Sequence, residues 1–194
     1  NIGLNTASSE ALDLTGNPRV INLNIDLGAF EQQNALYVDQ SATSGASNGL
    51  SWADAFLTLQ DALAAANSGE LIFVAAGTYY PDEGISQINN NRASTFQLNN
   101  GVEIYGGFPT GGGIRDAAMN KTILSGDLDQ NDGPNFANNS GNAYHVLTGS
   151  GTDATALLDG FTIAGCNADG SNFPDNAGGG IFNQNASPTI NDCS

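Results

Sequence analysis

A short acidic segment at 127–133 carries the residue types that bind calcium. It reads Asp-Leu-Asp-Gln-Asn-Asp-Gly, and its side-chain oxygens come from Asp127, Asp129, Asn131 and Asp132. Oxygen ligands at alternate positions near a glycine are typical of a calcium loop, and Mg²⁺ is less suited to so many flexible protein oxygens. The segment departs from the EF-hand pattern, because its sixth position is Asp and its twelfth is not Glu. We predict a calcium site here, with a solvated acidic turn as the alternative.

Residues that could carry carbohydrate chemistry do not form a recognisable set. A lyase acting on uronates needs a Lys or Arg base and cationic groups for the sugar carboxylates, and a hydrolase needs two or three carboxylates on one face. No spacing places a pair on one strand face among the available acids, which are Asp127, Asp129, Asp132, Asp153 and Asp159. His145 has no nucleophile motif beside it, and Cys166 has no basic neighbour. We therefore predict no catalytic residue.

The charge balance limits the partners. The 194 residues include 20 Asp and Glu against 4 Lys and Arg, for a formal net charge of -16, and the four cations are scattered. Nucleic acid is excluded because phosphate binding needs clustered Lys and Arg, and anionic membrane surfaces are disfavoured for the same reason. No apolar run reaches membrane-spanning length. Only 12% of residues are charged, so the surface must be largely neutral and polar, which suits an extracellular or cell-surface location.

Short strand-like runs, separated by Gly, Asn and Asp, dominate the chain. They lie at 71–74, 102–105, 122–124, 145–148, 160–163 and 188–190. Their uneven spacing is typical of a solenoid in which insertions leave at the corners. We predict an all-β fold, a right-handed parallel β-helix solenoid. A sandwich of hairpins is the alternative, but the two-residue turns that it needs are scarce here.

Two of these runs suggest a register. Run 161–166 aligns with run 188–193, and one constant offset places Cys166 opposite Cys193. That offset suits one coil, and stacked strands lie about 4.8 Å apart. The two cysteines are therefore predicted to stack on adjacent coils, either as a disulfide or as a reduced pair. The same frame predicts an inward apolar ladder of Ile123, Ile163 and Ile190.

One amphipathic helix is predicted at about 52–66. Ser51 and Asp54 resemble a capping box, and Asn-Ser-Gly at 67–69 is a stop signal. The apolar stripe consists of Trp52, Phe56, Leu59 and Leu63. Because it precedes the first strand run, we expect this N-terminal helix to cap the open end of the solenoid.

Several motifs resemble those of secreted bacterial right-handed parallel β-helix proteins with the pectate-lyase-like architecture, found on giant surface proteins. The motifs are Tyr37-Val38-Asp39, Gly49 to Phe56 (GLSWADAF), Leu59 to Leu63 (LQDAL), Ile72 to Tyr79 (IFVAAGTY), Gly101 to Phe108 (GVEIYGGF), Thr122 to Asp127 (TILSGD), Asp159 to Ile163 (DGFTI) and Gly178 to Ile181 (GGGI). The resemblance covers residues 35–194 with order and spacing kept. It implies extracellular display, often without catalytic activity.

Residues 1–34 resemble the carboxy-terminal end of a unit of the same family, followed by a linker. The matching motifs are DLTGNPR at 13–19 and IDLGAFE at 25–31. We therefore expect a junction between tandem units, with residues 35–194 forming the second one.

These expectations combine into a function. We predict an extracellular structural or adhesive module of a filament or giant cell-surface protein. Copies of it would associate head to tail, with Val20-Ile21 and 25–30 as strands of the joint, and its surface would contact glycans. The alternative is a carbohydrate-active enzyme, a polysaccharide lyase or hydrolase.

Overall fold

The computed structural model describes residues 20–21, 24–25, 34–43 and 45–194. The chain divides into two compact units, 1–34 and 35–194. In the first unit, β1 (Val20–Ile21) pairs antiparallel with β2 (Asn24–Ile25). The motifs at 13–19 and 25–31, on which the expected terminal coil rests, lie almost entirely outside the described residues.

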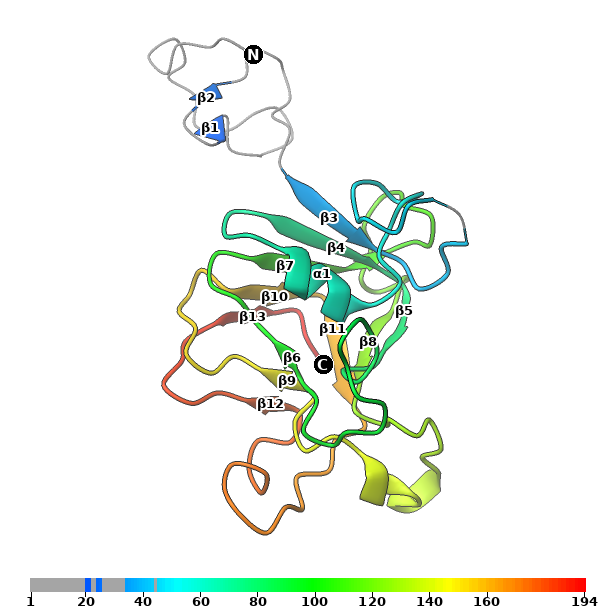
Figure 1. The fold of residues 1–194 in the computed structure, drawn as a ribbon, viewed down its shortest axis with the longest axis vertical. Helices are drawn as coiled ribbons and strands as arrows, with labels where there is room; N and C mark the ends of the chain where they lie inside the picture. Colours follow the sequence, from blue (N-terminus) through cyan, green and yellow to red (C-terminus); the bar gives the residue numbers. More distant parts are fainter. Residues whose placement is uncertain (1–19, 22–23, 26–33, 44) are drawn as a thin grey trace. The chain divides into compact units, whose positions relative to one another are not determined.

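The second unit contains three parallel sheets, which Figure 1 shows with their strands stacked in layers. The first sheet consists of β3 (Ala35–Val38), β4 (Leu71–Ala75), β7 (Glu103–Phe108), β10 (Leu157–Asp159) and β13 (Thr189–Asn191). The second consists of β5 (Gly77–Tyr79), β8 (Thr122–Ser125) and β11 (Phe161–Ala164). The third consists of β6 (Phe96–Gln97), β9 (Leu147–Thr148) and β12 (Ile181–Phe182).

This arrangement corrects the predicted fold. The prediction of a right-handed parallel β-helix solenoid is wrong, because the parallel sheets are not wound into a solenoid. In the first sheet Leu71 pairs with Glu103 and Glu103 pairs with Leu157, so the strands of this sheet follow one another at unequal intervals along the chain. Long irregular segments separate the short strands, including two 3-10 turns, η1 (Pro134–Phe136) and η2 (Asn139–Gly141).

The predicted register between the runs at 161–166 and 188–193 is also wrong. The run at 188–190 belongs to β13, which pairs with β10 of the first sheet and not with β11. The true step is longer than the predicted one and leads from Leu157 to Thr189. Consequently the predicted ladder does not form: Ile123 pairs with Thr162, and Ile163 pairs with Leu124.

The corrected register also changes the predicted pairing of the two cysteines. The backbone of Ser194 bonds to both sides of Thr162, with Ser194 N donating to Phe161 O (3.0 Å) and Ile163 N donating to Ser194 O (2.8 Å). This places Thr162 beside Ser194, so Cys166 does not face Cys193. Both cysteines are free thiols.

The helix is shorter than predicted and begins later. Helix α1 (Leu59–Ala65) starts after Thr58, whose hydroxyl donates to Asp61 (2.7 Å) and accepts from the Asp61 backbone N–H (3.3 Å). The expected pair at Ser51 and Asp54 does form hydrogen bonds, but it closes a turn. Helix α1 contacts β3 and β6 and buries Leu59, Ala62 and Leu63.

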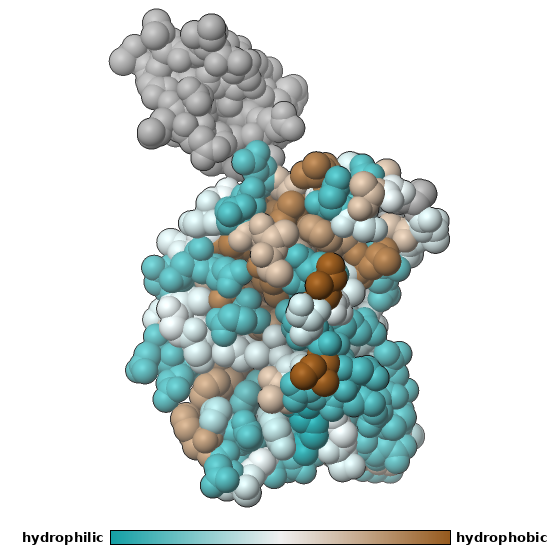
Figure 2. All heavy atoms as spheres, in the orientation of Figure 1, coloured by the Kyte–Doolittle hydropathy of each residue, from teal (hydrophilic) through white to brown (hydrophobic). Residues whose placement is uncertain are grey.

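The core lies on one face of the first sheet. Side chains alternate along a strand, and the buried residues of the inner face include Leu36, Val38, Ile72, Val74, Ile104 and Leu158. These residues pack with apolar side chains of the other two sheets and of α1 into one cluster. Figure 2 shows that hydrophilic residues predominate on the visible surface, with hydrophobic residues in separate patches. Because side chains alternate along a strand, the residues of β3, β4 and β7 that lie between the buried ones point away from the core.

Candidate functional site

A row of aromatic rings lies on the outer face of the first sheet. Tyr37 pairs with Phe73, and Phe73 pairs with Tyr105, on three successive strands. Their ring centroids are 5.8 Å and 6.1 Å apart. All three residues are half-buried, whereas their strand neighbours Leu36, Ile72 and Ile104 are buried. The row is therefore a direct product of strand alternation and register.

Two further rings widen the row. Trp52 lies 5.0 Å from Tyr37 and 5.4 Å from Phe108, and Phe108 lies 4.9 Å from Phe73, all between ring centroids. The interplanar angles range from 38° to 68° across the five contacts. We call the five residues Tyr37, Trp52, Phe73, Tyr105 and Phe108 the aromatic face.

A bulge in β7 brings Phe108 onto this face. The register shifts between Phe73 and Ala75, so that Ala75 pairs with Phe108. The extra residue restores an outward direction at Phe108, which simple alternation from Tyr105 would turn inward. Gly107 permits the bulge, because its φ of +92° is unfavourable for other residues. Its N–H donates to Thr122 Oγ1 (2.9 Å), which fixes the bulge to β8.

A cavity of about 450 Å³ opens beside Trp52. Its described lining comes from the loops at 39–43 and 110–111, and includes the hydroxyl-bearing residues Ser41, Thr43 and Thr110. Asp39, which is only 2% exposed, joins the two loops. Its Oδ1 accepts from Ser41 N (2.9 Å) and its Oδ2 accepts from Gly111 N (2.7 Å). The cavity therefore combines one indole edge with a rigid polar rim.

Charged groups border the aromatic face where the row continues onto β10. Asp159 pairs with Tyr105 in the sheet register and forms an ion pair with Arg115. The Arg115 guanidinium lies 5.3 Å from the centroid of the Tyr105 ring. Burial raises the pKa of Tyr105, and the hydrogen bond of its hydroxyl to Glu103 adds to this effect. The phenol therefore stays neutral, and the charges of Arg115 and Asp159 compensate each other.

The predicted calcium residues are engaged within their own loop. Asp127 Oδ1 accepts from Asn131 N (3.0 Å) and Oδ2 accepts from Asp132 N (3.1 Å), while Asp132 Oδ2 accepts from Asn142 Nδ2 (2.7 Å). Gly141 lies against the Asp129 carboxylate. Among the described residues, no three His, Cys, Asp or Glu side chains group as metal ligands. Calcium binding therefore stays a prediction. Of the predicted ligands, Asp132 is the one whose carboxylate accepts a hydrogen bond from another side chain.

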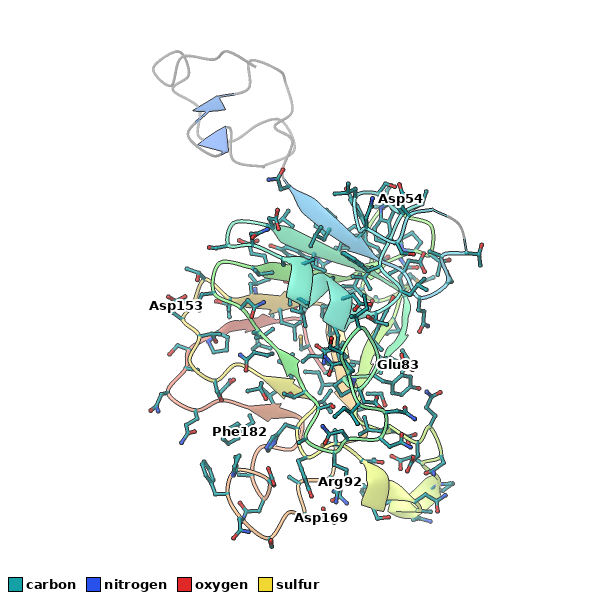
Figure 3. The ribbon with its side chains drawn as sticks, in the orientation of Figure 1. Asp54, Glu83, Arg92, Asp153, Asp169 and Phe182 are labelled. Carbon is teal, nitrogen blue, oxygen red and sulfur yellow. The ribbon has the colours of Figure 1, made fainter. Side chains whose placement is uncertain are left out.

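The other residues considered from the sequence are dispersed. Asp153 accepts hydrogen bonds from Thr155, which lower its pKa, and Figure 3 shows it at the left edge of the ribbon. His145 Nδ1 lies 3.2 Å from Gly178 O, and its ring stacks on Phe182 at 4.8 Å. These contacts give the histidine a packing role.

The residues of the aromatic face were not predicted as a site from the sequence. A signal was available, since Tyr37, Phe73 and Tyr105 each occupy the position after the first buried aliphatic residue of their strand. Recognising it required the true pairing of the three strands.

Comparisons with family models, with curated proteins and with solved structures returned no match. Within the described part of the chain, no helix is long and apolar enough to cross a membrane.

Proposed function

We propose that this protein is an extracellular structural or adhesive module that binds neutral glycans through its aromatic face. The observation on which the proposal depends is the set of five half-exposed rings on one sheet face, with a polar cavity beside Trp52. Aromatic rings stack on the apolar C–H faces of sugar rings, while hydroxyl and amide groups at the rim fix their orientation.

The charges favour neutral glycans over acidic ones. The net charge of -16 repels polyanions. The one described cation at the aromatic face, Arg115, already pairs with Asp159. A uronate would therefore lose its hydration without gaining a free cationic partner. Neutral sugars avoid this cost.

Association of copies belongs to the same proposal. An edge strand offers unpaired backbone groups to another chain. The outer edge of β3 is already bonded by its own chain, because Tyr37 N donates to Gly49 O and Asp39 N donates to Phe56 O, both at 2.9 Å. Strand β13 is the opposite edge of the first sheet. Of the two outermost described strands of this sheet, β3 is therefore the less suited to pairing with a second copy.

Trp52 provides the test, since it is the only tryptophan in the chain. Titration with soluble neutral polysaccharides should shift its fluorescence and protect it from quenching by acrylamide. Tyr37→Ala and Phe73→Ala keep this reporter and should each weaken binding about fivefold, for a lost ring contact of about 1 kcal/mol.

The matched control is Phe173→Ala, because Phe173 is an exposed aromatic that contacts Phe182 and not the aromatic face. Its affinity should equal that of the wild type. Unchanged Trp52 fluorescence with every neutral polysaccharide would contradict the proposal. Release of reducing ends or unsaturated products would instead favour the alternative, a carbohydrate-active enzyme.

A further inference from the structure

A second cavity, distinct from the one beside Trp52, lies at the loop 132–142. It measures about 580 Å³, and Gly165 and Cys166 also line it. This volume suits a single sugar unit or a small polar ligand. Its lining is rich in amides and includes one carboxylate, that of Asp132.

Asn142, which lines this cavity, presents an acceptor without a partner. The residue is 1% exposed, and its Nδ2 donates to Asp132 Oδ2 (2.7 Å). Its Oδ1 is buried and accepts no hydrogen bond within the described structure. A buried acceptor without a hydrogen-bond partner destabilises the fold. A ligand that donates a hydrogen bond would recover this free energy.

The position of Asn142 is fixed from behind. Its backbone oxygen accepts from Arg92 Nε (2.6 Å) and its N–H donates to Asn139 O (3.1 Å). Arg92 also pairs with Asp169, as Figure 3 shows, and lies over the Tyr144 ring at 4.2 Å. The backbone that carries this side chain is therefore held in place by several contacts.

The rim of the cavity adds an exposed aromatic ring. Phe136 is 85% exposed, and its φ of +62° is unfavourable for a bulky residue. Asn135 and Asn138 also have positive φ, at 58° and 70°. The loop thus holds an apolar ring in solvent beside the amides and the carboxylate.

We infer that this cavity binds one sugar unit whose hydroxyl or amino group donates to Asn142 Oδ1 and to the Asp132 carboxylate. Phe136 contacts the apolar face of the same ring. Because both groups to be satisfied are acceptors and one of them is anionic, an amino sugar should bind more tightly than a neutral sugar, and a uronic acid least. The inference shares the glycan class of the proposed function but concerns a separate site.

Three monosaccharides that differ mainly in charge test the inference: glucosamine, glucose and glucuronate. Each is titrated at millimolar concentration into the uniformly ¹⁵N-labelled protein, and the backbone and side-chain amide signals of residues 132–142 are followed. We expect saturable shifts, with glucosamine binding about tenfold more tightly than glucuronate, as one retained charge-assisted hydrogen bond would give. Equal affinities, or the reverse order, would overturn the inference.

Two exposed substitutions avoid the buried Asn142. Phe136→Ala should weaken every sugar about fivefold, whereas Asp132→Asn should mainly reduce the preference for glucosamine. Ile114→Ala, at a residue that is 91% exposed and does not line the cavity, is the control and should change neither. Affinities and sugar preferences that match the wild type in both cavity variants would also overturn the inference.

Two further results separate this site from the others. Tyr37→Ala, which keeps the Trp52 reporter, should weaken polysaccharide binding about fivefold while leaving the monosaccharide shifts intact, so that either proposal can fail alone. Calcium chloride without sugar is the last arm. If calcium moves these signals and no sugar does, the cavity is an ion site and the inference is wrong.

Discussion

Replacement of Gly107 by alanine tests how the backbone builds the aromatic face. Gly107 lies in the β7 bulge with φ of +92°. A Cβ there would lie 2.7 Å from Ala117 Cα and 2.8 Å from Ala117 N, which are backbone atoms. The left-handed φ costs about 1 kcal/mol, and an overlap with backbone adds about 2 kcal/mol. We expect Gly107→Ala to lower the free energy of unfolding by about 3 kcal/mol, or the Tm by roughly 6–12 °C.

Gly69→Ala is the matched control for this experiment. Its φ is +91°, and no atom lies within 4 Å of the position that a Cβ would occupy. Only the conformational cost remains, about 1 kcal/mol. Urea unfolding followed by circular dichroism measures both variants. Equal losses would show that Ala117 gives way and would refute the packing argument. Gly107→Ala should also weaken glycan binding by displacing Phe108, and Gly69→Ala should not.

Three other predictions follow from the titratable and metal-binding groups. Burial and the charge of Asp82 raise the pKa of Glu83 above 4.5. The protonated side chain therefore favours the folded state, and this contribution to stability is lost as the pH rises through the raised pKa. Glu83→Gln should therefore raise the Tm at pH 7 and lose this advantage near pH 4. If calcium binds at 127–132, a hundredfold excess over Kd should stabilise the fold by about 2.7 kcal/mol, whereas coinciding melting curves with calcium and with chelator would contradict the site. Both thiols should react with a disulfide reagent in the native state, and Cys166 should react faster, because burial raises the pKa of Cys193. A protein with no titratable thiol would contradict the strand register that separates the two cysteines.

The positions of several strands could be predicted from local sequence, but their partners could not. The runs at 71–74, 122–124 and 188–190 overlap β4, β8 and β13. One of the strands that no predicted run covered is β10 (Leu157–Asp159), which is short and lacks a β-branched residue. Because β10 was not predicted, the run at 188–190 was aligned with β11, which has a similar sequence but does not pair with it. Parallel pairing depends on contacts between residues that are far apart in the chain, and a local motif does not encode them.

The helix shows a tertiary contact overriding a local signal. Ser51 and Asp54 make the hydrogen bonds expected of a helix start. Phe56, however, forms a bridge with Val38, and its N–H donates to Tyr37 O (2.9 Å). These bonds hold the backbone extended at the edge of β3, so the helix begins only after Thr58. The same contact keeps Trp52 off the helix and places it on the aromatic face.

The aromatic face has a structural explanation as well as a functional one, and the two differ in where they place the largest effect. Cross-strand aromatic pairs each contribute about 0.5–1.5 kcal/mol to a sheet beyond the area that they bury. Phe73 contacts Tyr37, Tyr105 and Phe108, whereas Trp52 contacts two rings and borders the cavity. If the rings only stabilise the sheet, stability falls most at Phe73 and nothing in the cavity responds to sugars. If they bind glycans, affinity falls most at Trp52, the ring with fewer partners in the row. Stability would then fall most at Phe73 and affinity most at Trp52, which an aromatic ladder serving only the fold cannot produce.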